Sequence, residues 1–165
     1  MRRKRGCLAG ISILLLAFIV LLLVIQIIPY GKNHANPPVV QEPNWDSPQT
    51  RALAVRACFD CHSNETTWPW YSNIAPVSWL VYWDVQEGRQ RLNFSDINGT
   101  QRTGRGEGGE GSGGGEGRGG DEMARVIEGG SMPPWYYILQ HPTAGLSTAE
   151  KPQLIQGLQA TLGNR

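Results

Sequence analysis

Residues 58–62 read Cys-Phe-Asp-Cys-His, and this pentapeptide constrains the fold more than any other part of the chain. Residues three and four apart lie on one face of a helical turn, so the side chains of Cys58, Cys61 and His62 can contact the same planar ligand. C-x-x-C-H is the attachment signature of a c-type haem, in which two thiols add to the porphyrin vinyl groups and the imidazole binds the iron. The motif therefore predicts one covalent haem c, with Cys58 and Cys61 as thioether positions and His62 as proximal ligand.

Three other interpretations use the same residues. A tetrahedral zinc site needs a fourth ligand, and without a second cysteine pair only His34 and His141 remain for it. A thioredoxin-type dithiol is typical of a βαβ unit, whereas the flanks of this motif have a helical and aromatic pattern. A plain disulfide between the two close cysteines is the third. These alternatives predict a zinc or disulfide-stapled interaction module, and the motif favours haem over them.

The N-terminal segment has the pattern of a membrane anchor. Four basic residues at positions 2–5 precede an apolar run over residues 8–28, whose only polar side chains are Ser12 and Gln26. At 1.5 Å per residue, this run rises about 31 Å, which matches a bilayer core, and no A-x-A cleavage site follows it. The charge asymmetry predicts a cytoplasmic tail (1–7), one transmembrane helix (8–28) and an extracytoplasmic remainder. A single-pass protein of a bacterial cytoplasmic membrane, with a periplasmic haem domain, fits covalent haem attachment outside the cytoplasm.

The exported part is small and slightly acidic. Four of the 15 basic residues lie in the N-terminal tail, which leaves 11 against 14 acidic residues from residue 29 onward. This balance argues against a nucleic-acid partner. All six tryptophans also fall in this part, and a porphyrin would add apolar area that a core of this size lacks.

Helix signals divide the remainder of the chain and predict an all-α domain. Residues 29–45 are rich in proline and predict a semi-extended tether, followed by a haem-binding domain over 46–165. A flexible insert is predicted at 104–120, where 11 of 17 residues are glycine. Helices are predicted from Asp46-Ser47-Pro48 through the haem motif, from Pro76 to about Arg91, over Asp121–Glu128, and from the capping box of Ser147 and Glu150 to Leu162. The expected fold is a small cytochrome c-like helical domain around one haem, after one N-terminal transmembrane helix.

A second axial ligand is sought among few residues. Met132 is the first candidate, because it lies in a rigid Met-Pro-Pro turn and a thioether ligand suits electron transfer. The alternative is that Met132 only fills the core. His141, which precedes Pro142, is the second candidate ligand.

The same residues resemble the bacterial haem-binding domain proteins that carry a single C-x-x-C-H motif. The resemblance implies a membrane-anchored, extracytoplasmic haem c domain with Cys58 and Cys61 as thioether positions and His62 as axial ligand. It identifies no redox partner protein, and the glycine-rich insert departs from the family pattern. The similarity runs over residues 57–66, 68–79, 87–89, 92–95, 130–134 and 141–142.

Two function classes follow from a haem. The first is an electron carrier with a six-coordinate iron and no substrate. The second is a haem sensor or peroxidase-like enzyme with an open sixth position, which would place an acid, base or arginine beside the iron. Arg56 and Arg89 are the available arginine candidates, and each is better explained as a surface or propionate partner. Met132 favours the carrier, because it would occupy the position that catalysis needs.

Overall fold

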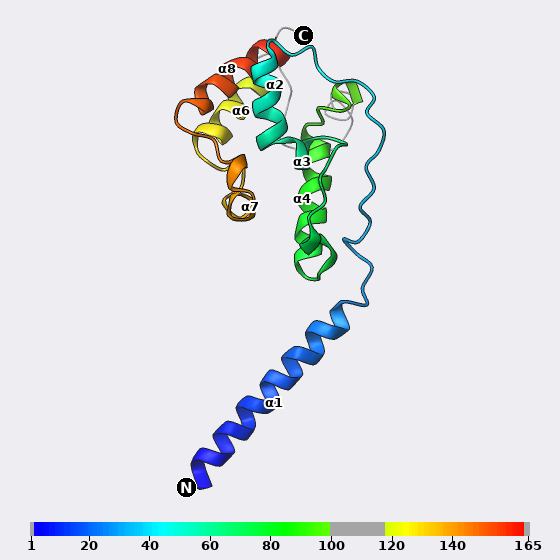
Figure 1. Ribbon diagram of the computed structural model, residues 1–165, viewed down its shortest axis with the longest axis vertical. Coiled ribbons are helices and arrows are strands. Elements are labelled where there is room, and N and C mark those ends of the chain that lie inside the picture. The colour runs from blue at the N-terminus through cyan, green and yellow to red at the C-terminus, as the bar shows by residue number, and fades with distance from the viewer. Residues whose placement is uncertain (1, 100–117, 164–165) are drawn as a thin grey trace. The chain divides into compact units, whose positions relative to one another are not determined.

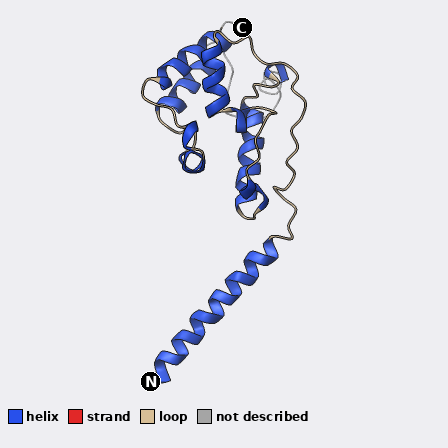
Figure 2. Cartoon of the chain, viewed as in Figure 1, coloured by secondary structure: helices blue, strands red, loops and turns tan. Residues whose placement is uncertain are grey.

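The computed structural model describes residues 2–99 and 118–163, which form helices and loops (Figures 1 and 2). No strand occurs in these residues, and their one extended pairing is an isolated parallel bridge between Gln41 and Asp96. The all-α prediction is confirmed. In chain order the elements are α1 (Arg2–Ile25), α2 (Pro48–Ala57), α3 (Phe59–His62), η1 (Trp70–Asn73), α4 (Val77–Arg91), α6 (Arg118–Glu128), α7 (Trp135–Gln140), η2 (Pro142–Ala144) and α8 (Glu150–Leu162).

The chain forms two compact units whose boundaries differ from the predicted division at residue 46. Unit 1 comprises Met1–Ala35 and Trp68–Asp84, and unit 2 comprises Asn36–Thr67 and Val85–Arg165. Helix α4 contributes residues to both. Every residue predicted to hold the haem lies in unit 2, so the candidate site is described within that unit.

In unit 1, the chain that follows α1 is tied to the residues around η1 and the start of α4. The side-chain amide of Gln26 donates to the Ala75 carbonyl at 2.8 Å, and its carbonyl oxygen accepts from the Ala75 N–H at 2.9 Å. The ring of Tyr30 meets that of Tyr82 edge-on, with 5.4 Å between their centroids. Unit 1 is therefore held by a paired amide and an aromatic contact.

Helix α1 carries apolar side chains that are mostly exposed between Ile11 and Val24. Among the residues searched, which are those that the structure describes, no helix combines the length and the apolar character needed to cross a membrane. The transmembrane helix predicted over residues 8–28 is not confirmed.

Helix α2 begins where the sequence signals placed it but ends earlier than predicted. The Ser47 hydroxyl accepts the N–H of the residue three positions later at 3.2 Å, and Pro48 occupies the first helical position. The helix was predicted to continue through the haem motif. It ends instead at Ala57, because Cys58 leaves the helical region with φ −128° and ψ −32°, and α3 starts a new turn at Phe59. The prediction of one continuous helix was wrong.

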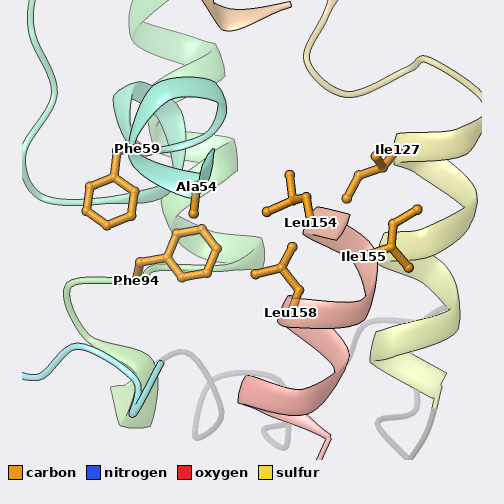
Figure 3. Packing of buried hydrophobic residues seen from close by; sticks show 7 residues of the cluster. All are labelled: Ala54, Phe59, Phe94, Ile127, Leu154, Ile155 and Leu158. Carbon is orange, nitrogen blue, oxygen red and sulfur yellow. The ribbon is translucent and has the colours of Figure 1, made fainter. Parts of the chain in front are cut away.

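The core of unit 2 joins α2, α6 and α8 to the motif and to the segment after α4 (Figure 3). The rings of Phe59 and Phe94 stack at 5.5 Å, and both lie near Trp45. Helices α2 and α8 approach closely at Gly157, where a Cβ would lie 2.8 Å from the Cβ of Thr50. The buried apolar cluster consists of Ala54, Phe59, Phe94, Ile127, Leu154, Ile155 and Leu158.

The predicted capping box of the last helix is confirmed. The Ser147 N–H donates to Glu150 Oε2 at 2.9 Å, and the Glu150 N–H donates to Ser147 Oγ at 3.2 Å. The sequence did not predict α7, a helix of six residues whose aromatic side chains show no simple amphipathic period. Its contacts, described below, are tertiary.

Part of the predicted tether belongs to unit 2. The Ser95 carbonyl accepts hydrogen bonds from the N–H groups of Val40 and Gln41, at 2.8 and 3.0 Å. The Gln41 carbonyl accepts a hydrogen bond from the N–H of Ile97 at 3.2 Å. Val40 and Gln41 are therefore bonded to the segment after α4, because their backbone groups pair there instead of with water. The predicted insert at 104–120 lies outside the described residues up to residue 117. Its last three residues belong to α6, which begins at Arg118 and not at Asp121, so the predicted end of the insert was wrong.

Candidate haem site

Backbone hydrogen bonds place the motif on one helical turn. The N–H groups of Cys61 and His62 both donate to the Cys58 carbonyl, at 3.1 and 2.8 Å. Cys58 is the N-cap residue of α3, and Cys61 and His62 follow it within one turn of backbone. Both cysteines are free thiols and are partly buried.

The imidazole of His62 is held by two carbonyls at the C-terminal part of α4. Its Nδ1 lies 3.0 Å from the Gly88 oxygen and 3.1 Å from the Leu92 oxygen. A carbonyl oxygen only accepts hydrogen bonds, so Nδ1 carries the proton and Nε2 keeps its lone pair. Burial lowers the pKa of His62, although both carbonyls favour its protonated form. The ring is therefore oriented as a neutral imidazole with Nε2 available to a metal.

Gly88 allows α4 to lie directly against the motif. A Cβ at this position would meet the Cys61 carbonyl oxygen, and it would lie 2.9 Å from the carbonyl carbon. Residue 88 therefore both accepts the His62 hydrogen bond and provides the space for α3. This role of Gly88 was not predicted from the sequence, although a glycine inside a predicted helix signals a close approach.

The two residues between the cysteines have separate tasks. Phe59 is buried in the core of unit 2, and the Arg51 guanidinium lies 5.7 Å from its ring centroid. The Asp60 carboxylate accepts the Thr67 N–H at 2.9 Å and the Tyr137 hydroxyl at 2.6 Å. One side chain thus fixes α3 in the core, and the other ties it to two more segments.

Arg89 organises the loop that follows the motif. Its Nε donates to the Ser63 carbonyl at 2.8 Å, and its Nη2 donates to Asn36 Oδ1 and Thr66 Oγ1, both at 2.9 Å. Arg56, in contrast, forms an exposed ion pair with Glu150 at 2.7 Å. The structure gives each of these two arginines protein partners that were not predicted.

Burial also favours the protonated thiol form of Cys58. It raises the pKa of the Cys58 thiol to about 12, because a thiolate would lose its hydration there. A reactive dithiol requires a lowered thiol pKa, which is the opposite of what Cys58 shows. Within the described residues, no three or more His, Cys, Asp and Glu side chains gather as a metal ion would require.

Two free thiols and a neutral imidazole with a lone pair on Nε2 form the donor set that a c-type haem uses. The Nδ1 hydrogen bonds supply the outer partner that orients a metal-bound histidine and raises its basicity. The residues present therefore fit this group. Cys58 and Cys61 would hold it covalently, and His62 would bind its iron.

The two candidate sixth ligands flank α7: Met132 lies on the loop before it, and His141 is its C-cap residue. Met132 is 39% exposed, and its N–H donates to the Val126 carbonyl at 3.0 Å. His141 is half-buried, and its ring stacks on that of Tyr137 with 4.4 Å between centroids and 16° between planes. Tyr137 is the residue that contacts Asp60 of the motif. The structure thus links His141 to the motif through one side chain and places Met132 on the preceding loop.

Comparison with known proteins gives a family match. The haem-binding domain family matches residues 20–160, which include both motif cysteines, His62 and α7. No curated protein and no solved structure matches the chain. Because the match covers most of the chain, and because the motif presents the donor set described above, this protein belongs to the haem-binding domain family.

Proposed function

We propose that this protein is an electron carrier that holds a single covalent haem c through Cys58, Cys61 and His62. The observation that supports it most is the double hydrogen bond from His62 Nδ1 to the carbonyls of Gly88 and Leu92, which leaves Nε2 free for iron. When bound, the haem supplies one-electron redox chemistry. The chain's own part is to hold the imidazole in one tautomer and orientation, and to carry the two thiols at the N-cap and within the single turn of α3.

A carrier function is favoured over catalysis by the use of the arginines. A peroxidase-like site needs a polar group that is free to act on a bound oxygen species. Arg89 is engaged with three oxygen atoms of the chain, and Arg56 is paired with Glu150. The proposal therefore gives the protein a cytochrome c-like role with a redox partner protein, and a sensor or peroxidase with an open sixth position is its alternative.

The sixth ligand decides between these two functions, and we propose Met132 for it. The oxidised wild type should then be low-spin and show the weak far-red sulfur-to-iron absorption band. Met132→Ala should become high-spin and lose at least 0.1 V of reduction potential, on the order expected for loss of a thioether ligand. His141→Ala should remain low-spin. Optical spectra, a pyridine haemochrome assay and redox titration of protein made with a cytochrome c maturation system measure these outcomes.

The results of this experiment also separate the alternatives. A silent Met132→Ala with a disruptive His141→Ala would make His141 the ligand and retain the carrier. A wild type that is already high-spin would leave the sixth position open and favour the sensor or peroxidase. A wild type without a haemochrome spectrum would defeat the haem proposal itself.

We also propose that the protein is anchored in a bacterial cytoplasmic membrane and carries its haem unit in the periplasm. The support comes from the basic residues at 2–5, the apolar run over 8–28, and the exposed apolar side chains of α1. The need for covalent haem attachment outside the cytoplasm agrees with this orientation.

A fusion experiment tests this topology. Alkaline phosphatase fused after Arg165 should be active and should sediment with membranes, because it folds only outside the cytoplasm. The same fusion with residues 2–28 deleted should be inactive. An inactive full-length fusion, together with an active cytoplasmic reporter at the same site, would contradict the proposed orientation.

A further inference from the structure

The hydroxyl of Tyr137 joins α7 to the centre of the haem motif. It donates to Asp60 Oδ2 at 2.6 Å, across 77 positions of sequence. Asp60 stands between the two cysteines, and its other carboxylate oxygen accepts the Thr67 N–H. Both carboxylate oxygens of Asp60 therefore accept a hydrogen bond, and the bond to Thr67 orients the carboxylate that the Tyr137 hydroxyl binds.

Helix α7 needs tertiary contacts to hold its position. It has only six residues, and a helix of that length is not stable by itself in water. None of its residues is buried, and no side chain caps its N-terminus. A hydrogen bond between a hydroxyl and a carboxylate is among the stronger kinds that proteins form. The Tyr137 bond therefore ties α7 directly to the motif.

The same tyrosine also places a candidate ligand. The His141 ring lies parallel to the Tyr137 ring, one helical turn further along the chain. At the other end of α7, Met132 lies two residues before Pro134, the N-cap residue of this helix. A change in the position of α7 would therefore move both candidate sixth ligands together.

We infer that Tyr137 is a positioning residue for the sixth iron ligand, acting through its hydrogen bond to Asp60. This inference rests on the proposed function, and it holds for Met132 and for His141 as the ligand. The bond keeps α7 in register with the attachment turn, so that the internal ligand competes effectively with small molecules from solution.

Imidazole titration of the ferric protein tests the inference. The apparent affinity for an added ligand scales with the fraction of protein whose internal ligand is displaced. Tyr137→Phe removes only the hydroxyl, and it should raise the apparent affinity for imidazole about tenfold, as expected for the loss of a charge-assisted hydrogen bond. Leu139→Ala, at an exposed side chain of the same helix, should change the affinity less than twofold. Soret spectra and haem staining on a denaturing gel accompany each titration.

A second variant, at the acceptor of the same hydrogen bond, tests the inference independently of Tyr137→Phe. Asp60→Asn keeps an acceptor but not its charge, so it should raise the imidazole affinity in the same direction and by less. It provides the measurement if Tyr137→Phe does not accumulate. The double variant should differ little from Tyr137→Phe, because both changes weaken the same bond.

The outcomes distinguish the inference from the function beneath it. Stained Tyr137→Phe protein with unchanged imidazole affinity and spin state would overturn the inference, since the bond would then be merely structural. A stained wild type that is already high-spin would overturn it too, because no internal ligand would need positioning. A wild type without stain would instead defeat the haem proposal.

Discussion

Replacing Cys58 and Cys61 together by alanine is expected to abolish haem staining on a denaturing gel. Each cysteine would form one of the two thioether bonds, so either single change should weaken the staining and only the double change should remove it. Free thiols at both positions, on one helical turn with His62, motivate this expectation. Staining intensity per polypeptide is the measurement.

The chain supplies a matched control for this experiment. Cys7 is its third cysteine and lies outside the motif. Cys7→Ala should therefore leave staining unchanged. Stain that persists in the double variant would refute covalent attachment through these two cysteines, and stain per polypeptide lost in the Cys7 variant would show that the loss is not specific to the motif.

The second large effect is expected at Gly88. Gly88→Ala should lower the free energy of unfolding by about 3 kcal/mol, because the added methyl group meets the Cys61 backbone, which has little room to shift. The substitution should also lower haem content, since moving α4 away from α3 lengthens the hydrogen bond from His62 to residue 88. Denaturant unfolding and a haemochrome assay per polypeptide measure the two effects.

Gln90→Ala is the comparison variant for Gly88→Ala. It places the same alanine on the same helix, at an exposed side chain. Its stability and haem content should match those of the wild type. If Gly88→Ala behaves in the same way, the close approach of α4 to the motif is not required for either property.

The helix boundaries that the sequence predicted well depend on local signals. Ser47 with Pro48, and Ser147 with Glu150, satisfy the first N–H groups of their helices within a few residues, so their patterns can be read without the fold. The break at Cys58 could not be read this way. The residue after the break, Phe59, stacks on Phe94, a contact between segments distant in sequence that local signals do not show.

The candidate site divides in the same manner. The three motif residues follow from their spacing, because the helical turn alone brings them together. Gly88, Leu92 and Tyr137 could not be assigned by spacing, because each meets the motif across a long sequence separation. Their side-chain or backbone roles depend on how α4 and α7 pack.

Residues 36–42 form hydrogen bonds with other parts of unit 2, and these bonds determine where the chain could be shortened to give a fragment that still carries the haem site. Glu42 forms two hydrogen bonds with Arg51, at 2.7 and 2.8 Å, and this pairing lowers the pKa of its carboxyl group. Asn36 accepts a hydrogen bond from Arg89. A truncation at the start of α2 would remove both Glu42 and Asn36. Arg51 would then lose its acceptor, and Arg89, which binds the loop after the motif, would lose one of its acceptors. A fragment that begins before Asn36 retains them, so the proline-rich stretch belongs to the smallest piece worth expressing.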